Sequence, residues 1–347
     1  MSSPYINVFL FLVWFLVSCS CNSHIMDGFV QELEDGNGAA IHNESVRLQL
    51  NKLTTLLPSM NTIGISIYVK QDNYTSCQIY FPDDLPSFQD IGNYTDYIHQ
   101  LGMKVLLKVG VEIGNSDIYS YINPSDPSCW FQSYNEILLS VGKFGELYHI
   151  EYFSIGLELT NMTINATYLP YWLDSISQLR DVYHGNLTYS SLLFEWSRIP
   201  TKFWEALDYI GIDAYVPVAT MSEPYFNRTL AVEVWQYFLN ILDGWRKSNN
   251  LVDKPVIFTE IGYPSADFSL VIPWEVPNDS SCKKEANQLI QQQIYSFLVD
   301  WYVDNSIVEL QPYEHLISGI VTFILLYATL CQFITLYVRN STMTHSN

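Results

Sequence analysis

The chain has 347 residues, 48% hydrophobic and 15% charged, which is typical of a folded globular protein rather than a disordered one. Its net charge of −20 argues against an electropositive nucleic-acid surface and against binding to an anionic membrane surface. The length fits one large α/β barrel or two ordinary domains.

The N-terminal segment predicts export. An uncharged apolar core at residues 8–17 is followed by small residues at 18–23, the pattern of a secretory signal peptide that ends near residue 22. Glycosylation sequons of the form Asn-x-Ser/Thr agree with a lumenal or extracellular chain, and they begin at Asn43, Asn73, Asn93, Asn161, Asn165, Asn186, Asn227 and Asn278. We therefore expect a glycoprotein of the secretory pathway.

Beyond residue 26 the chain alternates between strand-like and helix-like segments. Strands are predicted near Gly28 and at residues 62–69, 104–109, 150–157, 187–191, 209–215 and 256–259. Helices are predicted at residues 45–57, 94–101, 130–144, 168–183, 202–207, 231–247 and 282–303. Such alternation predicts a parallel sheet with right-handed crossovers, and the number of units fits a (β/α)8 TIM barrel over residues 26–312. The sequence has no Gly-x-Gly-x-x-Gly or phosphate loop, which counts against a nucleotide-binding sheet.

Three cysteines belong to the expected barrel. Cys77 and Cys129 fall in segments interpreted as loops after consecutive strands, so we expect them to form a disulfide and leave Cys282 free. No Cys/His spacing resembles a zinc site, and the histidines are scattered. We therefore expect no metal and no cofactor.

An uncharged apolar run at residues 316–338 is long enough to cross a bilayer. Arg339 and a short polar tail at 339–347 follow it, which favours a single-pass transmembrane helix over a lipid-anchor signal. This interpretation places the barrel outside and Arg339 in the cytosol. Two alternatives remain: a divergent eighth strand at residues 318–327, and a reading frame that passes its true last exon. A missing eighth strand would leave two barrel edges unpaired.

Two glutamates stand at the ends of predicted strands. The stretch KPVIFTEIGYPS ends the seventh strand with Glu260, and YFSIGLELT ends the fourth with Glu158. In a closed barrel the tips of these strands face each other across the central opening. Two carboxylates placed in this way are what glycoside hydrolysis requires. The alternative is that each glutamate is a strand-end residue hydrogen-bonded to a helix N-terminus.

The stretches GNLTYSS, IPTKFWEALDYIGIDAYVPV and KPVIFTEIGYPS, with FSIGLEL upstream, resemble the clan A glycoside hydrolases, most closely the family 113 β-mannanases. The resemblance covers about residues 26–303. It implies a (β/α)8 barrel and endo-acting, retaining hydrolysis of β-mannan or a related glycan. It also implies Glu158 as general acid/base, Glu260 as nucleophile, and a hydrogen bond from Tyr215 to the nucleophile.

Three aromatic residues near the expected site are candidates to stack on sugar rings. They are Tyr68, Trp196 and Trp274, and each also fits a position in the core or at the rim.

Two charged residues are further candidates. Lys108, at the tip of the third strand, is placed to donate to a sugar hydroxyl, and the alternative is a salt bridge with Glu112. Asp213 is a possible substrate contact, but a structural partner for a neighbouring strand is favoured.

The sequence departs from the family at four places. Lys108-Val109-Gly110 stands where the family has Lys-Pro-His, and SSLL at 190–193 stands where it has an Asn-Trp pair. Leu157 precedes the acid/base where the wider clan often has Asn, and no Trp follows Trp301 to end an eighth strand. These changes leave two alternative functions: a catalytically weakened, membrane-tethered carbohydrate-binding protein, or a glycosylated adhesion scaffold.

Overall fold

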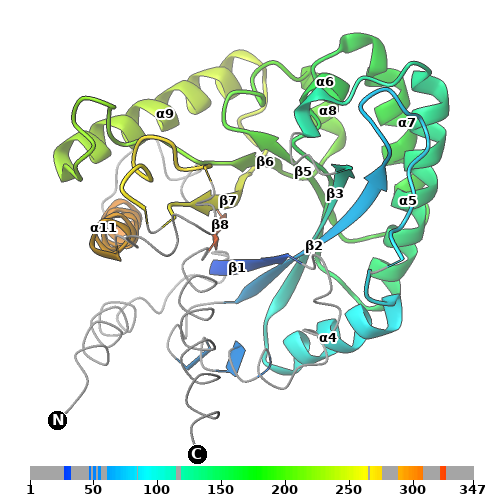
Figure 1. The fold of residues 1–347 in the computed structure, drawn as a ribbon, viewed down its shortest axis with the longest axis horizontal. Helices are drawn as coiled ribbons and strands as arrows, with labels where there is room; N and C mark the ends of the chain where they lie inside the picture. The colour runs from blue at the N-terminus through cyan, green and yellow to red at the C-terminus, as the bar shows by residue number, and fades with distance from the viewer. Residues whose placement is uncertain are drawn as a thin grey trace, which may run out of the picture.

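Eight parallel strands form the centre of the molecule (Figure 1). The computed structural model describes residues 27–32, 47, 50–51, 54–55, 61–83, 85–114, 119–264, 266–275, 288–307 and 321–325. The strands are β1 (Asp27–Glu32), β2 (Thr62–Gln71), β3 (Lys104–Ile113), β4 (Tyr152–Leu157), β5 (Asn186–Leu192), β6 (Ile210–Asp213), β7 (Val256–Gly262) and β8 (Val321–Leu325). Each pairs with the next, and β8 also pairs with β1, so the sheet closes into a barrel. The predicted parallel α/β barrel is confirmed.

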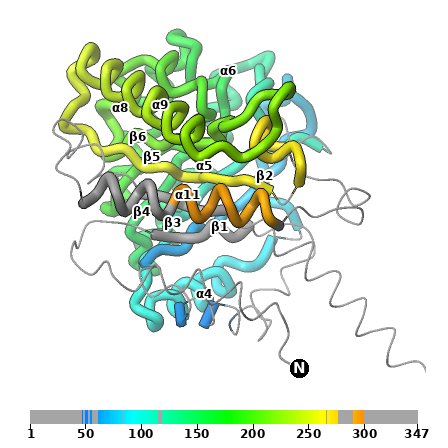
Figure 2. Tube along the Cα trace, turned by 90° about the vertical axis from the view of Figure 1, so that its left-hand side faces the viewer, coloured from blue at the N-terminus to red at the C-terminus, as the bar shows by residue number. Residues whose placement is uncertain are grey.

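Helices surround the strands, and Figure 2 shows α9 and α11 on the side that carries β7. Their bounds are α4 (Phe88–Gln100), α5 (Pro127–Leu147), α6 (Thr160–Thr163), α7 (Leu169–Arg180), α8 (Thr201–Ala206), α9 (Arg228–Ser248) and α11 (Gln288–Ile307), with short 3-10 turns η1 (Tyr119–Tyr121) and η2 (Ala166–Tyr168). Between β1 and β2, the described residues of the predicted helix at 45–57 are also helical.

Local sequence explains where the elements begin. The helix α4 starts at Phe88, earlier than predicted, because the Ser87 side chain accepts a hydrogen bond from the backbone N–H of Asp90 and caps the first turn. In the same way Asn227 caps α9 through the N–H of Leu230. The strands β2 and β3 are buried along almost their whole length, as expected for parallel strands covered on both faces.

The eighth strand corrects the interpretation of residues 316–338. Val321–Leu325 pairs in parallel with β7 on one side and with β1 on the other, so these residues are a barrel strand and not part of a transmembrane helix. The alternative of a divergent eighth strand is therefore the one the structure has. The barrel also extends past the expected boundary at residue 312. In the described part of the chain, no helix has the length and apolar character that a membrane crossing needs.

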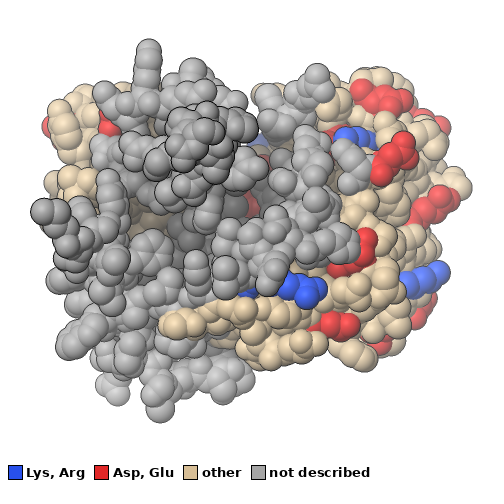
Figure 3. Space-filling model, turned by 60° about the horizontal axis from the view of Figure 1, so that its bottom comes forward, with Lys and Arg blue, Asp and Glu red and all other residues tan. Residues whose placement is uncertain are grey.

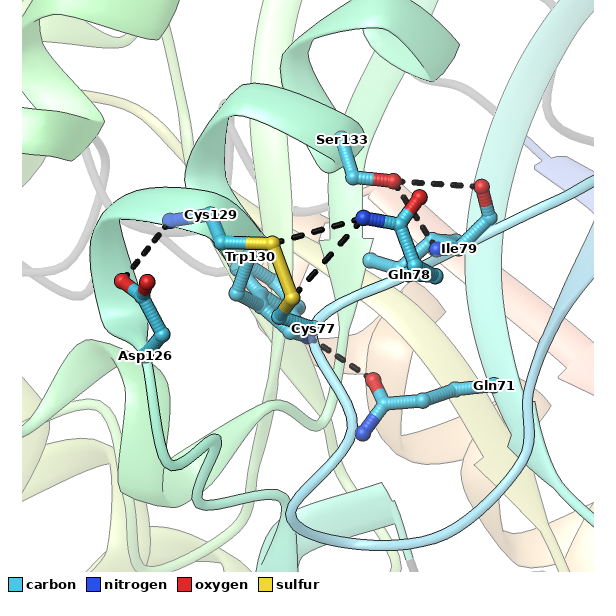
Figure 4. Close-up of a disulfide and its surroundings, with 8 residues drawn as sticks. All are labelled: Gln71, Cys77, Gln78, Ile79, Asp126, Cys129, Trp130 and Ser133. Carbon is cyan, nitrogen blue, oxygen red and sulfur yellow. Dashed lines mark hydrogen bonds between the residues drawn. A yellow bond between two sulfur atoms is a disulfide. The ribbon is translucent and has the colours of Figure 1, made fainter.

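The disulfide between Cys77 and Cys129 is confirmed (Figure 4). It joins the loop after β2 to the first turn of α5, where Asp126 caps the helix by accepting from the Cys129 N–H. A second link lies beside it, because the Ser133 hydroxyl contacts the backbone of Ile79. Cys282 lies outside the described residues.

The features that predict export lie either at the surface of the described structure or outside the described residues. The predicted signal peptide and the sequons at Asn43 and Asn278 lie outside them. None of the six sequon asparagines that the structure describes is buried, and Asn73, Asn93 and Asn227 are exposed. Acidic side chains are scattered over the described surface in Figure 3, in keeping with the negative net charge. Glycosylation and export stay predictions.

Candidate active site

The two predicted glutamates lie at the carboxyl ends of β4 and β7. Glu260 is part of β7, which continues to Gly262, beyond the predicted strand end. Glu158 follows the last residue of β4 and adopts a left-handed backbone conformation with φ 53°. Its N–H donates to the carbonyl of Ser190 at 2.8 Å, which ties the turn to β5. Such a conformation is uncommon for a residue with a side chain, so this turn is held by its surroundings.

Lys108 is the direct partner of Glu260. Its side chain is fully buried, and its Nζ donates to Glu260 Oε1 and lies 3.7 Å from Asp213 Oδ1. Burial alone would lower the pKa of Lys108, but the Asp213 and Glu260 carboxylates outweigh it and raise that pKa. Lys108 is therefore a cation fixed inside the barrel.

This contact differs from both interpretations of Lys108 made from the sequence, a hydrogen bond to a sugar hydroxyl and a salt bridge with Glu112. Glu112 is 4.0 Å from Lys70 instead. The Lys108 ammonium is enclosed by carboxylates, so it has no exposed surface to offer a sugar hydroxyl. It acts on Glu260 from within the barrel.

Tyr215 donates its hydroxyl to the other oxygen of Glu260, Oε2, at 2.5 Å, which is the hydrogen bond that the family resemblance implied. The ring lies close against β7 at Gly262. A Cβ at that position would sit 2.6 Å from the Tyr215 Cε1 atom, so glycine is needed for this approach. Each oxygen of Glu260 thus accepts from one donor, Lys108 or Tyr215.

Asp213 lies opposite Glu260 in the register of β6 and β7. Its Oδ1 accepts from the Thr259 hydroxyl at 2.6 Å, which makes it the structural partner of a neighbouring strand, as favoured from the sequence. Its Oδ2 is buried without a hydrogen-bond partner among the described residues. Burial and the Glu260 charge raise the pKa of Asp213 to about 8, against the opposing effects of Lys108 and Thr259.

The same surroundings favour the protonated form of Glu158. Burial raises the pKa of its carboxyl well above the ordinary value, and the charges of Asp213 and Glu260 raise it further, while Lys108 opposes them. The residue is only partly buried, so part of it stays in contact with solvent. The surroundings therefore favour a proton on Glu158, whereas Glu260 accepts hydrogen bonds from two donors.

The three aromatic candidates differ in their surroundings. Trp196 is a core residue: it is buried, packs against Trp245 and donates its ring N–H to the Leu193 carbonyl at 2.7 Å, so its predicted role in sugar stacking is wrong. Tyr68 is 5% exposed and lies beside Tyr119. Trp274 is 51% exposed in the segment after β7. Sugar contacts of Tyr68 and Trp274 stay predictions.

Sequence reasoning missed a further carboxylate, Glu195. It is buried in the loop after β5 and accepts hydrogen bonds from side chains beyond β4 and on β5. Its only signal in the sequence is a glutamate inside the apolar stretch LLFEW. Across the described residues, no group of three or more His, Cys, Asp or Glu side chains is arranged to hold a metal ion.

Comparisons with known proteins show the family and the fold. The family model described as Glycoside Hydrolase Family 113 matches residues 35–308. A solved GH113 β-1,4-mannanase is 22% identical, with a TM-score of 0.66 over 87% of this chain and 88% of that one. The GH113 β-mannanase from Alicyclobacillus acidocaldarius in complex with ManMIm is 18% identical, with a TM-score of 0.65 over 87% and 85% of the two chains. Identities of this size establish a shared fold. No curated protein matches the chain.

Proposed function

The chain belongs to Glycoside Hydrolase Family 113 and is therefore a glycoside hydrolase, and from this premise we propose that it cleaves β-linked, mannan-type glycans by a retaining double displacement. The observation that carries the proposal is the difference between the two glutamates. Glu158 has a raised pKa, which favours its protonated form, whereas Glu260 accepts from Lys108 and Tyr215. Two carboxyl groups whose surroundings differ in this way suit an acid and a nucleophile.

In the first step a Glu260 oxygen bonds to the anomeric carbon while the glycosidic C–O bond breaks. The proton of Glu158 passes to the departing oxygen. In the second step the oxygen of a water molecule attacks the anomeric carbon, its proton passes to Glu158, and the bond to Glu260 breaks. The acid and the nucleophile are thus restored at the end of the cycle.

Lys108 gives this cycle a constant counter-charge. Before the first step the negative charge is on Glu260, and after it the charge is on Glu158, because Glu260 has become a neutral ester. The buried ammonium interacts with both carboxyl groups, so a positive charge lies near the negative one in each state. A preorganised charge of this kind stabilises the transition state without rearrangement.

The substrate class rests on the family and on the descriptions of its solved members, which are a β-1,4-mannanase and a β-mannanase. The test uses β-1,4-mannan and an activated aryl β-mannoside with Glu158→Ala and Glu260→Ala. If Glu260 forms the covalent intermediate, the rate of Glu260→Ala should fall at least about 10³-fold on both substrates. Added azide should then restore activity and give a product of inverted configuration.

If Glu158 is the acid, Glu158→Ala should lower kcat/KM far less on the aryl mannoside than on the mannan, because kcat/KM reports the first step and a good leaving group needs little protonation there. Glu223→Ala, an exposed glutamate in the loop after β6, is the matched control and should behave as wild type. Unchanged rates for both active-site variants would refute the mechanism. Binding of mannan without any cleavage by the wild type would favour a carbohydrate-binding protein instead.

A further inference from the structure

Glu195 is the most densely bonded carboxylate among the described residues outside the candidate pair. Its Oε1 accepts from the Thr163 hydroxyl at 2.5 Å and the Tyr189 hydroxyl at 2.7 Å. Its Oε2 accepts from the Thr160 hydroxyl at 3.1 Å and from the backbone N–H of Leu192 at 3.0 Å. A buried carboxylate with four donors is satisfied, and it fixes the segments that supply them.

Two of these donors belong to the segment that carries Glu158. Thr160 and Thr163 are the first and last residues of α6, which begins two residues after Glu158. This single turn has no side-chain cap of its own, and an isolated turn of helix is unstable. Glu195 supplies the contacts that hold it against the loop after β5.

The backbone of Glu158 needs such support. Its left-handed conformation is unfavourable for a residue with a side chain and persists only where neighbouring contacts impose it. The Glu158 N–H is fixed by Ser190, and the Thr160 N–H donates to the Glu158 carbonyl at 2.9 Å. Thr160 is in turn held by Glu195. The chain of contacts therefore runs from Glu195 through Thr160 to the backbone of the candidate acid.

We propose that Glu195 is a positioning residue for the general acid: through Thr160 and Thr163 it sets the direction of the Glu158 carboxyl. The inference rests on the proposed function, since it takes Glu158 as the acid. Proton transfer requires the donor within hydrogen-bond reach of the departing oxygen, and a misplacement of about 1 Å is enough to lose much of the rate. Loosening α6 should then harm reactions that need the proton and spare those that do not.

The test compares two variants that each remove one hydroxyl donor from the same oxygen of Glu195. Thr163→Val removes the donor on α6, and Tyr189→Phe removes the donor on β5. For Thr163→Val we expect kcat/KM on mannooligosaccharides to fall about tenfold and kcat/KM on a dinitrophenyl β-mannoside to change less than about twofold, because kcat/KM reports the first step, in which a good leaving group needs little protonation. For Tyr189→Phe we expect the two rates to change by the same factor.

Thr163 is also the last residue of the sequon that begins at Asn161, so Thr163→Val removes a glycosylation signal. Asn161→Gln removes the same signal and keeps the hydroxyl, and it should leave both rates unchanged. If Thr163→Val does not give folded protein, Thr160→Val, which removes a donor to the other oxygen, is read in the same way.

The outcomes separate the inference from the function it rests on. If Glu158→Ala shows the dependence on leaving group and Thr163→Val does not, the positioning role is wrong and the acid stands. If Glu158→Ala itself shows no such dependence, or the wild type has no turnover, the proposed function fails first. If each of Thr163→Val and Tyr189→Phe changes the rates on the two substrates by the same factor, Glu195 has a purely structural role.

Discussion

Lys108 on β3 and Glu260 on β7 form a buried ion pair that crosses the barrel, so the candidate nucleophile is held by a cation from the opposite side of the sheet. In a closed sheet of eight strands, β3 and β7 lie on opposite sides. The pair therefore connects the two sides of the barrel as well as setting the charge of the site.

Removing the cation should impair every substrate alike. Lys108→Met leaves buried carboxylates without their counter-charge, and we expect turnover to fall about 10²–10³-fold on both mannan and aryl mannosides, because the loss is electrostatic and independent of the leaving group. Breaking a buried pair should also lower the free energy of unfolding by about 3–5 kcal/mol. Lys70→Met, a partly exposed lysine at the end of β2, is the control for removal of a positive charge. Wild-type turnover in Lys108→Met would contradict this account of the site.

Asp213 should make stability depend on pH. Its pKa rises from 3.8 to about 8 on folding, so the folded state binds the proton more tightly, and the free energy of unfolding should fall as pH rises from about 4 to about 8. Asp213→Asn has no such proton and should reduce this slope, leaving the contribution of Glu158, which has the same sign. Urea unfolding at pH 5 and pH 8 measures both slopes. Identical slopes in the variant and the wild type would mean that Asp213 is ionised throughout.

The disulfide should contribute substantially to stability. It closes a loop with a sequence separation of 52 between Cys77 and Cys129, for which a stabilisation of about 3–4 kcal/mol is expected. Thermal unfolding with and without reductant should show a lower Tm for the reduced wild type. The double variant Cys77→Ser/Cys129→Ser should match the reduced protein and show no response to reductant. A response that persists in the double variant would point to another cysteine.

Closure of the barrel by β8 can be tested at Thr322, which pairs with Phe258 of β7 and Asp27 of β1. Thr322→Pro removes a backbone donor from a strand with neighbours on both sides, and a loss of at least about 3 kcal/mol or of folded protein is expected. Thr322→Val keeps the N–H and should be close to wild type in unfolding experiments. Tolerance of proline at this position would indicate that the segment lies outside the barrel.

The sequence predicted most of the fold because its signals are local. Apolar runs bounded by Gly and Pro marked seven strands, and the two glutamates were visible because a carboxylate at the end of a buried strand is unusual. The eighth strand was less clear, since a short strand within a longer apolar run has no pattern that separates it from part of a membrane helix. Only its pairing with β1 and β7 distinguishes the two.

The site was harder to predict because its contacts join distant parts of the chain. Lys108 meets Glu260 across 152 positions, and a lysine near a strand end has the same local pattern whether it faces solvent or the barrel interior. Trp196 was misassigned for a similar reason, since a tryptophan after a strand fits a rim or a core equally well until Trp245 packs against it. Glu195 became visible only when four donors were seen to converge on it.

The order in which the strands are synthesised delays the closure of the barrel. The strand β1 is synthesised about 290 residues before β8, its partner at the seam, which at about 5–20 residues per second means a wait of about 15–60 s. During that interval the edge of β1 lacks its partner, and β7 lacks its partner for only about the last 60 residues of it. Open edges invite pairing with other chains. We therefore expect the yield of folded protein to depend more on chaperones that protect the nascent chain than on the stability of the finished barrel.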